Sequence, residues 1–567
     1  MRASRRSVLL GLCVAACTES SRSTSAAGDG APGRTDATVS VNPEGGGDGN
    51  ASKGNAGESD AARLDAALTD GESSIDASRM DANDGARTPP GQDHSVLERN
   101  NHASRDGAFV EPLLTLAAAA KLAPDTAFQA VFAGSMLASP LYWERGPGGK
   151  GLFFAVTTGN DVFALDETSG ATVWRTNIGQ AAAGTGLSCG SIHPIGIIST
   201  PVIDASTGTL YVAGAIGAST IERHEVHALS VLDGSERPGF PVVVHGQSGG
   251  TTFTAQLENQ RSALALVNGI LYVAYGGHSG DCGAYHGWVV AIDTANPARL
   301  GSWATLGQGE GIWSPGGMAS DGSSIFAVTG NSTVAAADHM TSDSEEVVRL
   351  TGLGVVTRDP HNLYFPSTWR DMDARDSDLS ASNAMYVAVP GSTPSHLVVA
   401  LSKDGQLYLL DPANLGGMGG HLVTIPVAAG GASIHTVPAA YETTSGVHIV
   451  LSDNAQGLCP APRGKASTVL SVLIQPGAPP KPAVVWCAPL AGPITGPIAT
   501  TTDGKADAVV WYMNGGKLTG VDGDTGKPIF DGGSFTCDGV RQWTSPIVVK
   551  GRVVVGGDGH LCSWSPH

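Results

Sequence analysis

The chain has 567 residues, with 33 Lys or Arg against 52 Asp or Glu, and a formal net charge of −19 at pH 7. This acidic balance, without a basic stripe or a groove of mixed basic and aromatic residues, argues against nucleic acid as a partner. No stretch after Cys17 is long and apolar enough to span a bilayer.

The first residues are typical of an export signal. Arg2, Arg5 and Arg6 precede an apolar run at residues 8–16, which is shorter than the roughly 20 residues that a membrane span needs. Residues 14–17 resemble a bacterial lipobox, in which the cysteine accepts a diacylglycerol before cleavage. We therefore expect residues 1–16 to be removed and Cys17 to anchor the chain to a membrane on the extracytoplasmic side, in the periplasm or at the cell surface. The alternative is an ordinary signal peptide that is cleaved near Ala16.

Residues 17–107 are predicted to be a disordered tether. They consist mainly of Gly, Ser, Ala and Asp, and they contain no Phe, Trp or Tyr. Without large apolar side chains to bury, nothing offsets the entropy of ordering the backbone. The segment is expected to act as a spacer that lifts the folded part off the lipid surface.

From residue 108 to 567 a strand motif recurs. In its clearest copy, alternating apolar residues at 152–157 and 162–166 predict two half-buried strands, residues 166–170 predict the turn that follows, and Trp174 closes the unit. Long amphipathic helices are absent, which excludes an α/β fold. The sequence predicts an all-β fold, a β-propeller of four-stranded blades, with eight blades favoured over seven. The last copy lacks a strand, and residues 127–133 are expected to supply it and so close the ring.

These repeats are similar to the pyrroloquinoline-quinone (PQQ) repeat, and the chain from about Ser135 to Trp564 resembles the bacterial PQQ-binding-like β-propeller proteins. The resemblance rests on residues 162–174 and on the stretches 190–201, 280–288, 311–317 and 403–411. It predicts the fold, whereas the activity has to be argued from the site.

Six cysteines follow the anchor, an even number that predicts disulfide bridges in an exported domain. Of the several ways to pair them, we favour three bonds, which are Cys189–Cys282, Cys459–Cys487 and Cys537–Cys562. The chain has no pair of cysteines with the spacing of a zinc site, so a structural metal held by thiolates is not expected.

The resemblance also implies an enzymatic alternative, a dehydrogenase that oxidises alcohols or sugars with PQQ over a calcium ion. Its relatives use an Asn ligand after a Thr-Gly or Val-Gly strand end, which Asn331 resembles, and an Asp base in the next blade, which Asp376 and Asp378 resemble. The paired cysteines that such enzymes place against the cofactor, and their haem-binding signature, are absent. Asn331 is also expected as a turn residue at a strand end, and Asp376 and Asp378 are also expected in a solvated loop. Their presence therefore does not require a catalytic role. We therefore assign no cofactor.

A second cluster of polar residues suggests a metal site. It lies in one Gly-rich loop and consists of His278, Asp281, Cys282, Tyr285 and His286. A bridged Cys282 cannot be a ligand, and His286 more often packs within such a loop, so we expect no metal there. The function favoured by the sequence is a monomeric, non-catalytic binding scaffold that meets an envelope protein or glycan.

Overall fold

The computed structural model describes residues 93–567, except for 337, 430–435, 462–464, 493 and 567. The expected signal peptide, the anchor Cys17 and the tether up to residue 92 lie outside the described residues. The short helices are α1 (Leu116–Ala119), α2 (Trp369–Asp373) and three 3-10 turns, Pro147–Gly149, Ala255–Leu257 and Leu379–Ala381. Within the described part of the chain, no helix has the length and apolar character needed to cross a membrane.

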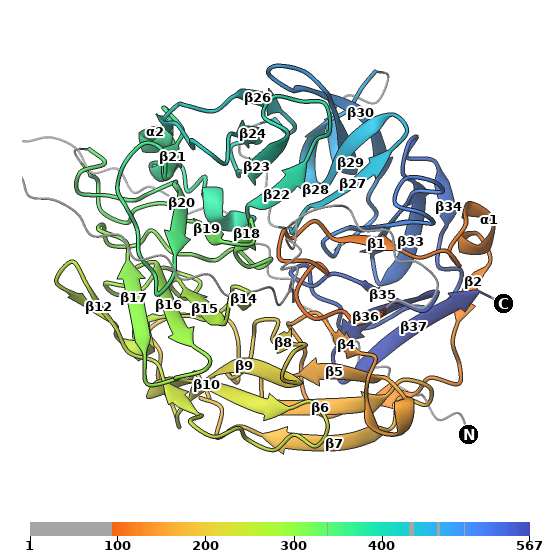
Figure 1. The fold of residues 1–567 in the computed structure, drawn as a ribbon, viewed down its shortest axis with the longest axis horizontal. Coiled ribbons are helices and arrows are strands. Elements are labelled where there is room, and N and C mark those ends of the chain that lie inside the picture. Colours follow the sequence, from red (N-terminus) through yellow and green to blue (C-terminus); the bar gives the residue numbers. More distant parts are fainter. Residues whose placement is uncertain (1–92, 337, 430–435, 462–464, 493, 567) are drawn as a thin grey trace, which may run out of the picture. The chain divides into compact units, whose positions relative to one another are not determined.

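The strands form eight sheets that follow one another along the chain, and a separate hairpin of β12 (Gln247–Ser248) and β13 (Thr251–Thr252). The sheets are the blades of a propeller, and the first strand of each lies nearest the centre of the ring (Figure 1). The eight-bladed fold predicted from the sequence is confirmed.

Blades 1 to 4 comprise the strands that follow. Blade 1 contains β4 (Leu141–Trp143), β5 (Leu152–Val156), β6 (Asp161–Asp166) and β7 (Thr172–Asn177). Blade 2 contains β8 (Val202–Asp204), β9 (Thr209–Ile216), β10 (Arg223–Ser230) and β11 (Val242–Val243). Blade 3 contains β14 (Ala265–Val267), β15 (Ile270–Tyr275), β16 (Trp288–Asp293) and β17 (Leu300–Ala304). Blade 4 contains β18 (Ala319–Ser320), β19 (Ser324–Val328), β20 (Val347–Thr351) and β21 (Leu363–Phe365), with β25 (Gly417–Met418) added at its edge.

Blades 5 to 8 continue the ring. Blade 5 contains β22 (Met385–Ala388), β23 (His396–Leu401), β24 (Gln406–Leu410) and β26 (Val423–Pro426). Blade 6 contains β27 (Ala439–Thr443), β28 (Gly446–Leu458), β29 (Lys465–Gln475) and β30 (Lys481–Pro489). Blade 7 contains β31 (Ile498–Thr501), β32 (Val509–Asn514), β33 (Lys517–Asp522) and β34 (Pro528–Phe530), with β1 (Ala108–Val110) beside β31. Blade 8 contains β35 (Ile547–Val549), β36 (Arg552–Gly557) and β37 (His560–Pro566), with β2 (Leu122–Pro124) and β3 (Ala130–Val131) paired to β37.

The repeated turn and tryptophan fix how neighbouring blades pack. Asp166 accepts hydrogen bonds from the backbone N–H groups of the turn that follows it, and Gly170 completes that turn at φ 74°. The indole of Trp174 then donates a 3.0 Å hydrogen bond to the carbonyl of Val231 in blade 2. Gly234 lies under this ring, where an added Cβ would stand 2.6 Å from it, so only glycine fits. The predicted role of the closing tryptophan, filling the gap between blades, is therefore observed.

The ring closes through the N-terminal part of the folded unit. β3 pairs with β37 at Ala130 and Leu561, which places the predicted segment 127–133 on the last blade. β2 pairs with the same strand at Leu122 and Pro566. The sequence did not predict a strand at β2. Joining the two ends of the chain in one blade leaves no open edge where the ring begins and ends.

Residues 93–111, which we call the axial segment, lie against the inner strands of the ring. The sequence analysis placed residues 93–107 in the tether, and this boundary is wrong. The segment has few apolar side chains, but its backbone and polar side chains form many hydrogen bonds with the strands, and composition alone does not reveal such contacts. Arg99 and Arg105 are both almost completely buried.

The axial segment contacts all eight blades, at the innermost strand of each or at a residue next to it. Its hydrogen-bond partners in chain order are Tyr142 (to Val96, 2.9 Å), Ile203 (to Leu97, 2.7 Å), Leu264 (to Arg105, 2.9 Å), Ser320 (to Ala103, 2.8 Å), Tyr386 (to Ser104, 3.0 Å), Ala440 (to Asp106, 2.6 Å), Ala499 (to Gly107, 3.0 Å) and Ser545 (to Arg99, 3.0 Å). Because these partners span the whole ring, the segment ties the blades together at their centre.

The structure contains the three predicted disulfides, Cys189–Cys282, Cys459–Cys487 and Cys537–Cys562. The first joins the segment that leads into blade 2 to a loop of blade 3, and the last lies within the closing blade. Three disulfides indicate an oxidising compartment.

Candidate functional site

The two ends of the ring differ. We call one end the loop face, because it carries the loops between the second and third strands of each blade and the segments that lead into the innermost strands. We call the opposite end the turn face. Glu144, in a turn of blade 1, donates its backbone N–H to Ser95 at 2.9 Å, and Gly551, in a turn of blade 8, donates to Glu111 at 2.8 Å. The axial segment therefore enters and leaves at the turn face.

The candidates Asn331 and Asp378 meet on the loop face. Asn331 follows β19 of blade 4, and Asp378 lies in the segment that leads into blade 5. The backbone N–H of Asn331 donates a 3.0 Å hydrogen bond to Oδ1 of Asp378. Asp378 is buried, whereas the side chain of the third candidate, Asp376, is 72% exposed. The structure thus brings Asn331 and Asp378 together and leaves Asp376 exposed at the edge of this site.

Lys403, in a loop of blade 5, completes this group. Its ammonium forms an ion pair with Oδ2 of Asp378 and a second one, at 3.1 Å, with Asp376. Burial lowers the pKa of Lys403, but the two carboxylates outweigh burial and raise it above the usual value. Both oxygens of Asp378 are therefore engaged, one by an N–H group and one by a cation. A carboxylate held in this way would have to break one of these contacts to reach a substrate proton.

Arg261 and two tryptophans lie nearer the axis. The guanidinium of Arg261 donates to the carbonyl of Trp313 at 3.2 Å and lies 5.2 Å from the ring centre of Trp543. Burial lowers the pKa of Arg261 to about 10, partly offset by the charge of Asp378. A cavity of about 10 Å³ lies beside this group, lined by Leu137, Ile198, Thr200, Arg261, Pro315 and Trp543. That space admits one water molecule.

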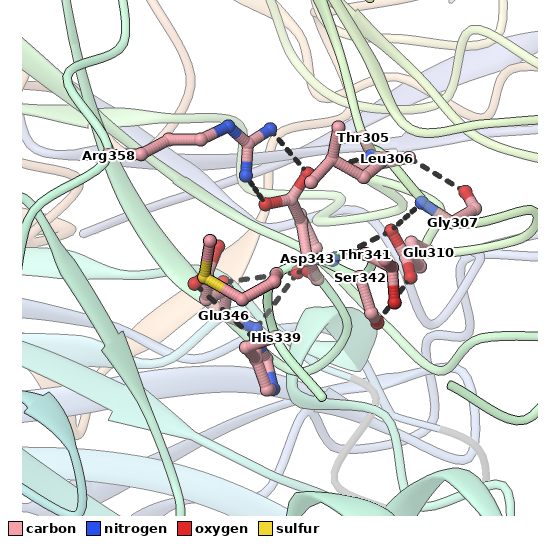
Figure 2. Close-up of polar contacts among 12 residues, drawn as sticks. Thr305, Leu306, Gly307, Glu310, His339, Thr341, Ser342, Asp343, Glu346 and Arg358 are labelled. Atoms are coloured by element: carbon pink, nitrogen blue, oxygen red, sulfur yellow. Dashed lines mark hydrogen bonds and ion pairs between the residues drawn. The ribbon is translucent and has the colours of Figure 1, made fainter. Parts of the chain in front are cut away.

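A network of buried carboxyl groups supports the loop at residues 329–346 (Figure 2). Glu310 accepts hydrogen bonds from Ser342 Oγ at 2.6 Å and from the backbone N–H of Asp343 at 3.0 Å. Asp343 in turn pairs with both terminal nitrogens of Arg358. Burial, helped by the charge of Asp343, raises the pKa of Glu310 to about 7, and burial also raises the pKa of Glu346 well above its usual value.

Two further carboxyl groups fix the same loop against blade 5. Asp373, at the end of α2, accepts hydrogen bonds from the backbone N–H of Ser332 at 3.0 Å and from Ser344 Oγ at 3.1 Å. Glu345 accepts the backbone N–H of Leu379 at 2.5 Å. Burial raises the pKa of Asp373 to about 6. Ser332 and Leu379, the residues that follow Asn331 and Asp378, are therefore both held by buried carboxyl groups. These hydrogen bonds support the contact between Asn331 and Asp378.

Sequence reasoning missed these supports. Lys403 begins the repeat motif at residues 403–411, at a position expected for a turn. Nothing in the sequence links it to Asp378. Arg261 lies in a polar stretch with Glu258, Asn259 and Gln260, and nothing in that stretch sets it apart as a site residue. Glu310 and Asp343 follow ordinary turn patterns, so their burial could not be inferred.

Four of the five residues of the Gly-rich loop have other partners, and the fifth, His278, is buried with its Nε2 lacking a hydrogen bond to any described residue. Tyr285 donates to Asp281 at 2.7 Å, Cys282 is bonded to Cys189, and the imidazole of His286 lies 3.1 Å from the carbonyl of Thr305. In the described chain, the His, Cys, Asp and Glu residues that come within 4.8 Å as a group of three are Cys537, His560 and Cys562. The two cysteines of that group form a disulfide, so they offer no thiolate to a metal.

Comparisons with known proteins place the fold. A family model described as outer membrane protein assembly factor BamB matches residues 152–345. The structure is similar to quinohemoprotein alcohol dehydrogenase ADHIIG from Pseudomonas putida HK5, at 14% identity, a TM-score of 0.58, and coverage of 83% of this chain and 80% of that one. The fold is that of an eight-bladed β-propeller.

Two other solved structures support the same fold. The quinohemoprotein alcohol dehydrogenase from Comamonas testosteroni is 15% identical, with a TM-score of 0.55 and coverage of 83% and 80%. A europium-containing methanol dehydrogenase is 14% identical, with a TM-score of 0.55 and coverage of 82% and 89%. No curated protein matches the chain. At such identities the likeness concerns the fold and leaves the activity open.

Proposed function

We propose that this chain is an exported, lipid-anchored propeller that binds an envelope protein or glycan through its loop face and catalyses no reaction. The observation that carries the proposal is the loop at residues 329–346. Two of its apolar side chains, Val334 and Met340, are 55% and 82% exposed, although buried carboxyl groups hold the loop in place. A contiguous patch of exposed apolar side chains is typical of a binding surface, and Val334 and Met340 are the side chains that we propose for such a patch on this loop.

The axial segment supports the same orientation. The first described residue, Asp93, is paired with Arg145 in a turn of blade 1, at the turn face. A tether that reaches the ring there leaves the loop face free to meet a partner. Lipid on Cys17 is the proposed anchor, and Cys17→Ser should move the chain from the membrane fraction to the soluble fraction. Membrane association that survives this substitution would exclude the anchor.

Site-specific photo-crosslinking in intact cells tests the binding face. A photoreactive residue at Met340 should give a discrete crosslinked product. The matched control is Leu113, which is 62% exposed and beside the turn at Gly551, and the same residue there should give none. Equal products at both positions, or products at Leu113 alone, would contradict binding through the loop face.

The alternative is a dehydrogenase that uses PQQ and calcium, and the contact between Asn331 and Asp378 is the observation that favours it. Asn331 and Asp378 supply oxygen donors that suit a hard cation, but Asp378 is already paired with Lys403. The axial cavity of about 10 Å³ is also far smaller than the several hundred Å³ of ordinary cofactor pockets. The residues present therefore do not fit the quinone. Calorimetric titration with PQQ and Ca²⁺ tests this, and saturable binding lost in Asp378→Asn would favour the alternative.

A further inference from the structure

A second cavity lies at the turn face, between the two ends of the axial segment. Its walls are formed by the incoming residues from Asp93 to Glu98, the residues from Asn101 to Ala103, the outgoing residues from Phe109 to Glu111, and Val548 of β35. Its volume is about 340 Å³, which is in the range of small-molecule sites. It is on the opposite face from Asn331 and Asp378, so it is distinct from the loop-face site.

Three carboxyl groups line this cavity, and the one histidine among its neighbours with a raised pKa, His102, is paired with Asp106; burial lowers that pKa, but Asp106 and Glu98 outweigh burial. The residues that line it include Asp93, Glu98 and Glu111 and the imidazoles of His94 and His102, and they include no Lys or Arg. Such a lining favours a positively charged ligand over an anion.

One of these carboxylates remains available to a ligand. Asp93 is paired with Arg145, and the two oxygens of Glu111 accept backbone N–H groups at 3.2 and 2.8 Å. Glu98 uses Oε2 for Arg105, at 2.8 Å, and its Oε1 has no hydrogen bond to any described residue. Burial raises the pKa of Glu98, with the charge of Arg105 acting in the opposite direction. A second cationic donor at Oε1 would offset that cost of burial.

Part of the wall is apolar, although Ser95 and Asn101 also line the cavity. Val96, Phe109 and Val548 are buried against the cavity, and Leu97 lies beside them. A ligand that fills the space therefore needs a charged end and an apolar body. Aliphatic and aromatic groups gain free energy when they leave water for such a wall.

We propose that this cavity binds a small amphipathic amine, with its ammonium on Glu98 and its apolar part against Phe109, Val96 and Val548. The site is independent of any partner on the loop face. The ammonium donates to Oε1 of Glu98 while Arg105 keeps Oε2. The class comprises primary amines that carry an aromatic or branched aliphatic group.

Isothermal titration calorimetry on the full chain tests the proposal with 2-phenylethylamine as the probe. Two analogues of similar size are the controls, 2-phenylethanol and 3-phenylpropionate. The amine should bind at least tenfold more tightly than the alcohol, and the carboxylate should not bind. Equal affinity for the amine and the alcohol would overturn the proposal, as would the absence of saturable heat with the amine at millimolar concentrations.

Two variants locate the site. Ala103→Phe fills the cavity without removing the backbone carbonyl that Ser320 uses, and it should abolish amine binding. Glu98→Gln should weaken binding at least tenfold. The matched control is Asp161→Asn, which also removes a carboxylate paired with an arginine, Arg175, outside the cavity lining. Thermal unfolding without ligand verifies that each variant folds. Amine binding unchanged in a folded Ala103→Phe protein would overturn the assignment.

Discussion

The backbone N–H of Asn331 donates to the carboxylate of Asp378 across 47 positions of the sequence, and Lys403 neutralises the same carboxylate from a third loop. This arrangement joins blades 4 and 5 at the loop face. Asp378 is held from two sides, which gives its carboxylate a structural role in joining the two blades.

Lys403→Met should lower the free energy of unfolding by about 3 kcal/mol, because it leaves the carboxylate of Asp378 buried without a cation. The double variant Lys403→Met with Asp378→Asn should recover most of that loss, since the amide can still accept the N–H of Asn331. Urea unfolding of the single and double variants measures the difference. Asp376→Asn, at the exposed rim, should stay within about 0.5 kcal/mol of the parent. Additive single effects would mean that the pair does not interact.

Glu310 should make stability depend on pH. Burial raises its pKa from 4.5 to about 7, so the folded state binds its proton more tightly than the unfolded state does. The resulting stabilisation is complete below pH 4.5 and is lost as the pH rises through about 7. Asp373, with a pKa raised to about 6, acts in the same direction.

Between about pH 5 and about pH 8, the parent should therefore lose roughly 2 kcal/mol of stability relative to Glu310→Gln. Unfolding free energies at both pH values for the two proteins give this difference. Glu222→Gln removes an exposed carboxylate and should follow the parent at both pH values. A parent that gains stability relative to Glu310→Gln over this range would show that the carboxyl group is ionised in the fold.

Deletion of residues 125–134 should abolish cooperative unfolding. It removes β3, and with it part of the pairing on β37 that joins the two ends of the ring. The control deletes Gly148 and Gly149, whose positions have no other atoms within 4 Å of an added Cβ, and it should unfold like the parent. Circular dichroism during urea titration follows both proteins. A single sharp transition in the longer deletion would mean that the ring closes without this strand.

The disulfides should contribute unequally. In the chain-entropy model the stabilisation grows with the logarithm of the loop that a bond closes. Cys189–Cys282 spans 93 positions and Cys537–Cys562 spans 25. Replacing the first pair with serine should therefore cost about 1 kcal/mol more than replacing the second. Urea unfolding of the two double variants gives the order, and a reversed order would show that native-state contacts dominate.

The sequence predicted the features that repeat. Residues 152–174 encode strand, turn and closing tryptophan in local order, and the same pattern gives the blades and the closing strand near Ala130. It also predicted the three cysteine pairs. The repeat pattern does not predict which residues far apart in the sequence contact one another. Arg105, for example, donates to the carbonyls of Leu264 and Met318, which lie 159 and 213 positions away in the sequence.

The predicted end of the tether shows why composition alone gave a wrong domain boundary. Residues 93–107 are as polar as the residues before them, but they are ordered by hydrogen bonds to strands that lie elsewhere in the sequence. For the candidate site, Asn331 and Asp378 could be named from their motifs. Their partner Lys403 and the buried carboxyl groups could not, because burial depends on the tertiary fold.

Dye-linked dehydrogenase assays on the purified full chain test most directly whether the loop face is a binding surface without catalysis. The protein is incubated with PQQ and Ca²⁺ and then supplied with primary alcohols or aldose sugars. We expect dye reduction no faster than in Asp378→Asn. Substrate-dependent reduction that requires calcium and disappears in Asp378→Asn would contradict this expectation.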